Sequence, residues 1–166
     1  MEAHWHVVHV SSRTEKKVTE RLIKNGFLAY LPVQKQLRQW SDRKKWVEMV
    51  MLSGYVFVKI TEKQHIKVLE VPGVSRFLKH NNKPVIISDA EMLHFQNFIA
   101  KLKDQPVEFS SEQIPVGTVV NIQTGHFKGF SGEVVLYKNK RKLIVRLLPI
   151  GYFSVELSPD DITILS

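Results

Sequence analysis

The sequence predicts an α+β protein in which an antiparallel sheet with helices is followed by a small β-barrel. Residues 1–103 follow strand and helix patterns in the order β-α-β-β-β-α-β-α, which favours an antiparallel sheet with helices packed on it. Residues 104–115 contain two prolines and follow neither period, so they predict a linker. Beyond it, turns recur about every ten residues, as in small barrels. The barrel strands are expected at 117–123, 132–137, 142–147, 152–157 and 161–165.

The first strand is predicted at residues 5–10, and a helix that ends near Lys24 follows it. Ser12 and Glu15 have the spacing of a capping box, in which each side chain bonds a backbone amide of the first helical turn. Val18 and Leu22 supply the apolar stripe of this helix, and the Asn-Gly pair at 25–26 predicts its end.

A long polar hairpin is predicted next. Its arms run from Gln34 to Trp40 and from Lys45 to Met51, with a turn at 41–44 between them. Both arms are rich in basic residues, and Trp40 and Trp46 lie near the tip. Such a polar hairpin is expected to project from the folded body.

Residues 55–60 predict the central strand of the first sheet. Val56, Val58 and Ile60 share one face, while Tyr55 and Phe57 share the other. Strand alternation normally leaves one face polar, but here the second face carries two aromatic rings. Both faces therefore require cover, either from helices of the same domain or from a partner.

Two further capping boxes predict two more helices, beginning after Thr61 and after Ser88. The first helix is short, with Ile66 and Leu69 expected to face inward, and it ends at the Pro-Gly pair 72–73. A strand at 74–79 and a turn at 81–82 follow it. The last helix is expected to end near Leu102, with an inward stripe formed by Met92, Phe95, Ile99 and Leu102.

Composition and charge restrict the classes of function. The chain has 166 residues, of which 43% are hydrophobic, and it has no cysteine. No apolar run approaches membrane-spanning length and no signal peptide is visible, so we expect a cytoplasmic protein with no disulfide. The formal net charge is +8, and summing residues by segment gives +9 for 1–103, −3 for 104–115 and +2 for 116–166. The basic first domain indicates a polyanionic partner, although a merely solvated surface is the simpler alternative.

Three segments of the chain carry motifs in a recognisable order. The first is Trp-His-Val-Val at 5–8, and the second is Leu-Ser-Gly-Tyr-Val-Phe-Val at 52–58, followed by Val-Pro-Gly-Val at 71–74. The third, at 116–120 and 125–134, is similar to the KOW motif. Together and in this order, the three segments resemble the NusG family of transcription elongation factors. Ser53 departs from the family pattern, which usually has proline there, and His6 and His9 also depart from it. These departures indicate a specialised paralogue that acts on selected operons.

The resemblance implies a NusG N-terminal (NGN, RNP-like) domain at 1–103, a linker at 104–115 and an SH3-like KOW domain at 116–166. It also implies a non-enzymatic elongation or antitermination factor that binds RNA polymerase at the clamp helices of the β′ subunit and promotes processive transcription. The implied bacterial location is the cytoplasm, with association to the nucleoid through the polymerase.

Candidate binding residues fall into three groups. The polymerase surface is expected to be an apolar groove that receives an amphipathic helix, lined by His9, Leu52, Tyr55, Phe57, Leu93 and Gln96. The non-template DNA of the transcription bubble is expected to contact Lys16, Lys17 and Arg21. A ribosomal protein or termination factor is expected to contact Ile150, Tyr152 and Phe153 of the barrel. The alternative for Tyr55 and Phe57 is ordinary core, and strand alternation makes one of Tyr152 and Phe153 core as well.

No catalytic or metal-binding arrangement can be defended from the sequence. His4 and His6 share a strand face, but His9 lies on the opposite one. We therefore expect no enzyme activity, no metal and no cofactor. The alternative function is an RNA-binding or ribosome-associated KOW protein, because a sheet of this kind and a KOW barrel can both hold RNA.

Overall fold

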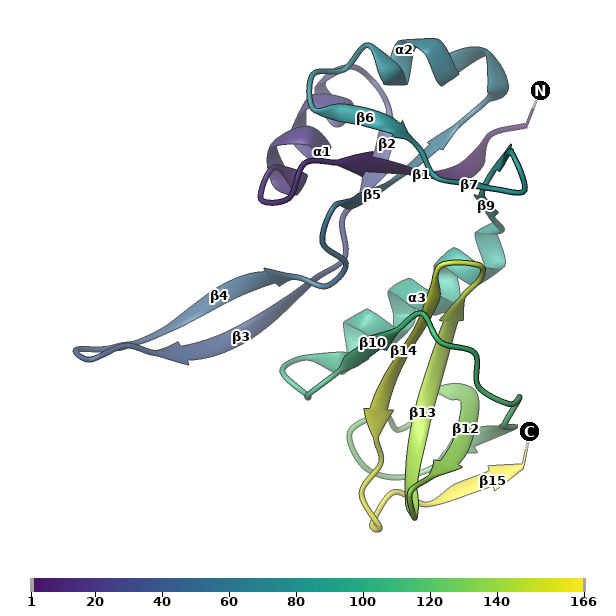
Figure 1. The fold of residues 1–166 in the computed structure, drawn as a ribbon. Coiled ribbons are helices and arrows are strands. Elements are labelled where there is room, and N and C mark those ends of the chain that lie inside the picture. The colour runs from purple at the N-terminus through teal and green to yellow at the C-terminus, as the bar shows by residue number, and fades with distance from the viewer. Residues whose placement is uncertain (1, 166) are drawn as a thin grey trace. The chain divides into compact units, whose positions relative to one another are not determined.

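The computed structural model describes residues 2–165, which form two compact units (Figure 1). The first unit contains the residues up to Gln34 together with Glu48–Leu93, and the second contains Lys35–Val47 together with the residues from His94 onward.

An antiparallel sheet organises the first unit, with strand order β2 (Leu28–Tyr30), β5 (Tyr55–Ile60), β1 (His4–Val10), β6 (Val74–Phe77). The short strand β9 (Ile86–Ile87) also pairs with β1. The predicted strand at 55–60 is confirmed, and it lies between β1 and β2. Because β1 and β5 are the two inner strands, they support the residues expected to form a binding surface.

One face of this sheet is covered by the helices of its own unit. These are α1 (Glu15–Lys24), the 3-10 turn η1 (Glu62–Gln64) and α2 (His65–Leu69). Val56, Val58 and Ile60 of β5 are fully buried in the resulting core. The rest of that core comes from β1, α1, α2 and nearby residues: Val8, Val10, Val18, Leu22, Phe27, Val68, Val71 and Phe77.

Two local expectations in this unit are wrong. Ser12 does not cap α1, because the helix begins at Glu15 after Thr14 and the Glu15 carboxylate bonds Gly54 instead. In α2, Val68 is buried while Ile66 and Leu69 are exposed. A five-residue helix has too few turns for apolar spacing to define its inward face. The capping boxes at Thr61 and Ser88 are confirmed.

Two hairpins complete this part of the chain. The small one pairs β7 (Lys79–His80) with β8 (Lys83–Pro84), and its turn residues Asn81 and Asn82 have φ of 52° and 63°. The long one pairs β3 (Val33–Gln39) with β4 (Lys44–Val50). Most of its residues are exposed, as the polar pattern predicts.

The second unit contains a six-stranded antiparallel sheet. Its strand order is β10 (Glu108–Ser110), β14 (Gly151–Glu156), β13 (Lys140–Leu147), β12 (Ser131–Tyr137), β11 (Thr118–Ile122), β15 (Thr163–Leu165). All five predicted barrel strands are present. Strand β10 is additional and lies within the segment expected to be a linker, where it pairs with β14.

Helix α3 (Asp89–Leu102) spans the division between the two units, which falls after Leu93. From His94 onward the helix packs on the six-stranded sheet. Phe95 stacks on Phe153 with ring centroids 5.3 Å apart, and Phe98 stacks on Phe127 at 6.0 Å. The buried stripe is Met92, Phe95, Phe98 and Leu102. Phe98 therefore takes the inward position expected for Ile99, which is half-buried.

Candidate functional site

The ring pair formed by His9 and Tyr55 lies on the inner strands of the first sheet. The two residues are directly opposite in the β1–β5 register, and their ring centroids are 4.7 Å apart. Both side chains are partly exposed. Burial, and then the positive charge of Arg76, lower the pKa of His9. The imidazole is therefore held neutral near pH 7, which suits contact with an apolar partner.

Phe57 follows Tyr55 on the same strand face and is fully buried. Tyr30 of the neighbouring strand β2 lies directly opposite Phe57, and the two ring centroids are 6.4 Å apart. Burial raises the pKa of the Tyr30 phenol to about 12, so this ring is neutral at all ordinary pH values. Phe57 thus belongs to the core of the folded chain, and its expected place on an exposed surface is corrected accordingly.

The turn before β5 positions the aromatic strand. Leu52 is 5% exposed, so it too is a buried residue and not part of an open surface. Gly54 has φ of +83°, a backbone conformation that favours glycine. The buried Glu15 carboxylate accepts hydrogen bonds from the Gly54 amide at 3.0 Å and from Ser53 Oγ at 3.4 Å.

The two predicted α3 contributors are placed differently. Leu93 is the last residue of the first unit and is 59% exposed. Gln96 is half-buried and belongs to the second unit. Of the six predicted residues, His9, Tyr55 and Leu93 therefore have accessible side chains within the first unit, while Leu52 and Phe57 are buried.

The three basic residues of α1 are exposed, but they are not equivalent. Lys16 forms an ion pair with Glu48 of β4 at 3.3 Å. Arg21 donates a hydrogen bond through Nη1 to the carbonyl oxygen of Pro72 at 2.9 Å, so it stabilises the turn that follows α2. Lys17 lies between them on the exposed surface of the helix, where it is accessible to a phosphate.

The barrel residues expected to bind a partner divide between surface and core. Phe153 is 1% exposed and packs between Phe95 and Phe109, so its predicted role in an exposed surface is wrong. Ile150 and Tyr152 are partly exposed. Strand alternation predicts this division, because Tyr152 and Phe153 point to opposite faces.

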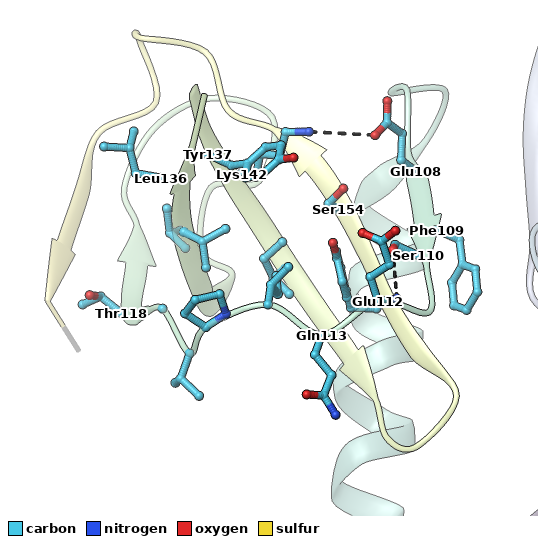
Figure 2. A pocket seen from close by; sticks show the side chains of 18 residues that line it. Glu108, Phe109, Ser110, Glu112, Gln113, Thr118, Leu136, Tyr137, Lys142 and Ser154 are labelled. Atoms are coloured by element: carbon cyan, nitrogen blue, oxygen red, sulfur yellow. Dashed lines mark hydrogen bonds and ion pairs between the residues drawn. The ribbon is translucent and has the colours of Figure 1, made fainter. Parts of the chain in front are cut away.

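A groove in the second unit was not predicted from the sequence (Figure 2). It encloses about 600 Å³ between the 108–118 segment and strands β12, β13 and β14. Lys142 and Glu108 form an ion pair of 3.8 Å at one end. Aromatic and aliphatic side chains line much of the groove, including Tyr137, Leu136 and Tyr152. No local sequence pattern signals it, because its walls come from segments far apart in the chain.

Arg146 holds the 114–117 segment beside this groove. Its Nε and Nη2 atoms donate to the Glu133 carboxylate at 2.8 and 2.9 Å. Nη2 also donates to the Pro115 carbonyl at 3.1 Å, and Glu133 Oε2 accepts from the Gly117 amide at 2.6 Å. The hydrogen bond from Arg146, assisted by that of Gly117, lowers the pKa of Glu133. The segment is thereby fixed by a charged pair.

The histidines of β1 form ring contacts instead of a ligand cluster. His6 Nε2 lies 3.1 Å from His65 Nε2, and both rings contact Phe77. Across residues 2–165, no group of three or more His, Cys, Asp or Glu residues is arranged to hold a metal ion. Within the same residues, no helix has both the length and the apolar character needed to cross a membrane.

Comparison with known proteins gives consistent matches. The family model described as "Transcription termination factor nusG" matches residues 3–96. A Rickettsia felis protein named "Transcription termination/antitermination protein NusG" is 27% identical over 158 residues, covering 86% of this chain and 81% of that protein. A Helicobacter pylori J99 protein of the same name is 31% identical over 114 residues, covering 66% and 62%.

Among solved structures, one described as "Domain interaction in Thermotoga maritima NusG" is similar to this chain. The two share 25% identity, and the match covers 95% of this chain and 94% of the other with a TM-score of 0.48. An MjSpt4:Spt5 complex also matches, with 18% identity and a TM-score of 0.33 over 93% of this chain and 98% of that one.

Proposed function

This chain belongs to the NusG family, and we propose that it is a transcription termination/antitermination factor that acts by binding RNA polymerase. The family model spans more than half of the chain, and the similarity to the Rickettsia felis relative covers 86% of it.

The proposed contact with the polymerase is the surface formed by His9, Tyr55 and Leu93. An amphipathic helix, such as those of the β′ clamp, would bury its apolar face against these side chains. The single observation that supports this choice best is the partly exposed His9–Tyr55 ring pair on the inner strands of a rigid sheet. Phe57, on the same strand face, and Leu52, in the turn before β5, are buried.

The polymerase-bound factor is proposed to promote processive transcription of selected operons, with Lys17 and its neighbours on α1 facing the non-template strand. The basic first segment of the chain supports this part, because a positive field favours approach to a nucleic acid. The partner of the barrel is proposed to be a ribosomal protein or a termination factor that contacts Ile150 and Tyr152.

The test is a paired measurement of polymerase affinity and thermal unfolding for Tyr55→Ala. Truncation of a binding hot spot costs roughly 2 kcal/mol, or about thirtyfold in affinity, while the folded state should persist because the ring is partly exposed. Tyr137→Ala is the matched control, because Tyr137 is a half-exposed tyrosine of the second unit.

An unchanged polymerase affinity in the folded Tyr55→Ala variant would remove this surface from the proposal. A chain that retains free RNA at physiological salt but does not retain polymerase would instead favour the RNA-binding or ribosome-associated alternative.

A further inference from the structure

The β3–β4 hairpin has two chemically different faces near its tip. Trp40 donates its backbone N–H to the Arg43 carbonyl at 2.8 Å, which closes a two-residue turn at 41–42. In such a hairpin, residues directly opposite each other share a face. Trp40 and Arg43 therefore lie on the same face, and Arg38 and Lys45 form the next pair on it. These four residues are called the basic face below.

Two cations of the basic face lie over an exposed aromatic ring. The Arg43 guanidinium lies 5.8 Å from the Trp40 ring centroid, and the Lys45 ammonium lies 5.9 Å from it. Trp40 remains 46% exposed, and all three cationic residues are exposed. Asp42 is the only acidic residue from 35 to 47, and it lies in the turn. The basic face therefore combines concentrated positive charge with an accessible indole.

The opposite face of the tip provides an internal comparison. Leu37 and Trp46 are directly opposite in the same register, and they are 46% and 58% exposed. The aromatic area is thus similar and Lys44 lies on this face as well, but the cations that lie over an indole ring, Arg43 and Lys45, are both at Trp40. The third tryptophan, Trp5, is 7% exposed and belongs to the core. Only the two hairpin indoles are available to a ligand among the described tryptophans.

Folding alone does not account for this arrangement. Exposed indoles leave a large apolar area in water, which gives no benefit to the isolated chain. Two cations held against one ring, with Arg38 next along the same face, repel each other unless an anion is present. A ligand that supplies both phosphate groups and flat apolar rings relieves both costs, and a single-stranded nucleic acid has this chemistry.

We propose that the basic face binds single-stranded DNA, with one unpaired base stacked on Trp40 and the adjacent phosphates held by Arg38, Arg43 and Lys45. A duplex is a poorer ligand, because the faces of its bases are already occupied by stacking neighbours. The choice of DNA as the source of the strand rests on the proposed function, in which the factor acts where the template duplex is opened. The Lys16–Glu48 ion pair also places the basic residues of α1 beside the base of this hairpin.

Binding is measured by fluorescence anisotropy with the full-length protein and a labelled deoxythymidine oligomer of about 15 nucleotides, which covers a typical single-strand site. Trp40→Ala is expected to weaken binding at least about fivefold, since base stacking on an aromatic side chain contributes on this scale. Trp40→Phe should retain most of the affinity. Trp46→Ala is the matched control on the opposite face and should change affinity less than about twofold.

Salt dependence tests the phosphate contacts separately. Replacing Arg38, Arg43 and Lys45 together by Gln should reduce the slope of log affinity against log salt concentration by about two, because each phosphate contact contributes about 0.7 for single strands. The same variants should bind polymerase as the unmodified chain does. Failure of this inference is therefore distinguishable from failure of the proposed function.

Four results would overturn the inference, three from comparisons between ligands or variants and one from Trp40→Ala itself. The first is equal loss from Trp40→Ala and Trp46→Ala, the second is affinity for a duplex of the same length that matches the single strand, and the third is clearly tighter binding of the matching RNA strand. Circular dichroism of each variant verifies that the hairpin change has not unfolded the chain. A folded Trp40→Ala variant with full affinity would also exclude the stacking role.

Discussion

The carboxylate of Glu15 accepts a hydrogen bond from the backbone amide of Gly54 at 3.0 Å, which links the first turn of α1 to the turn that precedes β5. Glu15 is 3% exposed. Its burial opposes ionisation, but hydrogen bonds from the amides of Gly54, Glu15 and Arg13 and from the Ser53 hydroxyl outweigh this, so the pKa of Glu15 is lowered. The contact therefore fixes the beginning of the strand that presents Tyr55.

Glu15→Gln should destabilise the chain by about 1.5–3 kcal/mol at pH 7, the range for hydrogen bonds to charged groups. The folded-state pKa of Glu15 lies below the unfolded value, so its contribution is complete above the unfolded pKa and is lost as pH falls through the folded pKa. Urea unfolding from pH 7 to pH 3 measures this. Stability should fall less steeply with acid in Glu15→Gln than in the unmodified chain, and Glu20→Gln, on the exposed side of α1, should behave as the unmodified chain does.

The His6–His65 contact should make stability depend on pH in a higher range. Burial is the main cause that lowers the pKa of His6 below its usual value of 6.5. The unfolded chain therefore binds this proton more readily, and stability should fall as pH decreases from above 6.5 toward the folded pKa. Chemical unfolding at pH 7.5 and pH 5.5 measures the change. His6→Leu should reduce this dependence, whereas replacement of exposed His80 by Leu should leave it intact. An identical dependence in His6→Leu would assign the effect to another group.

Several features of the fold could be predicted because their signals are local. Alternation at 55–60 gives β5 and its buried face directly, since Val56, Val58 and Ile60 all enter the core. The spacing of Thr61 with Gln64 gives the beginning of η1 for the same reason. These patterns depend only on strand geometry and on hydrogen bonds within one turn, so neighbouring residues determine them.

The incorrect expectations involve contacts between distant segments. Strand β10 exists because Phe109 is opposite Phe153, and three residues are too few for alternation to identify a strand. The Ser12 cap is wrong because Glu15, which could have completed it, bonds distant Gly54. The candidate polymerase surface shows the same limit, since strand direction predicts that Tyr55 and Phe57 share a face but does not predict which ring is covered.

Arg146→Ala should release the segment that borders the groove in the second unit. The substitution removes both hydrogen bonds to Glu133 and the bond to the Pro115 carbonyl. Loss of this partly buried pair should cost about 1–3 kcal/mol and should increase the rate of limited proteolysis between 104 and 117. In the unmodified chain, we still predict the first cut between Asp104 and Ile114, because the segment 104–115 is predicted to be the linker between the domains.

Lys140→Ala is the control for this experiment, because its ion pair with Glu156 at 3.4 Å joins two exposed side chains. Such pairs usually contribute little to stability. If Arg146→Ala and Lys140→Ala are cleaved at the same rate, the Arg146 contacts do not restrain the segment.

Ile150 and Phe153 should respond to substitution in opposite ways. Phe153→Ala should cost about 3–5 kcal/mol of stability, as for other buried aromatic side chains, because its ring packs between Phe95 and Phe109. Ile150→Asp should retain the fold, because Ile150 is partly exposed, but should lose cellular activity if this surface binds the barrel's partner. Thermal unfolding and a transcription readthrough assay separate the two effects. Full activity in folded Ile150→Asp would exclude this partner surface.

Of the three basic residues of α1, we expect only Lys17 to contact the non-template strand directly. Lys16 is paired with Glu48, and Arg21 donates to the Pro72 carbonyl, so both have structural partners. Lys17→Glu should therefore weaken crosslinking of the polymerase-bound factor to the non-template strand and should lower its salt dependence by about 0.7 in slope. Lys79→Glu, an exposed change of equal charge on β7, should have little effect.

Arg21→Glu has a different expected signature. The Pro72 carbonyl loses its donor, and the Arg21 guanidinium also lies beside Gly73, where a Cβ would come within 3.3 Å of Nη1. This variant should lose thermal stability. A change in its crosslinking therefore could not be attributed to a lost DNA contact alone. Unchanged crosslinking in folded Lys17→Glu, at both low and high salt, would show that Lys17 is only solvated and does not contact the DNA strand.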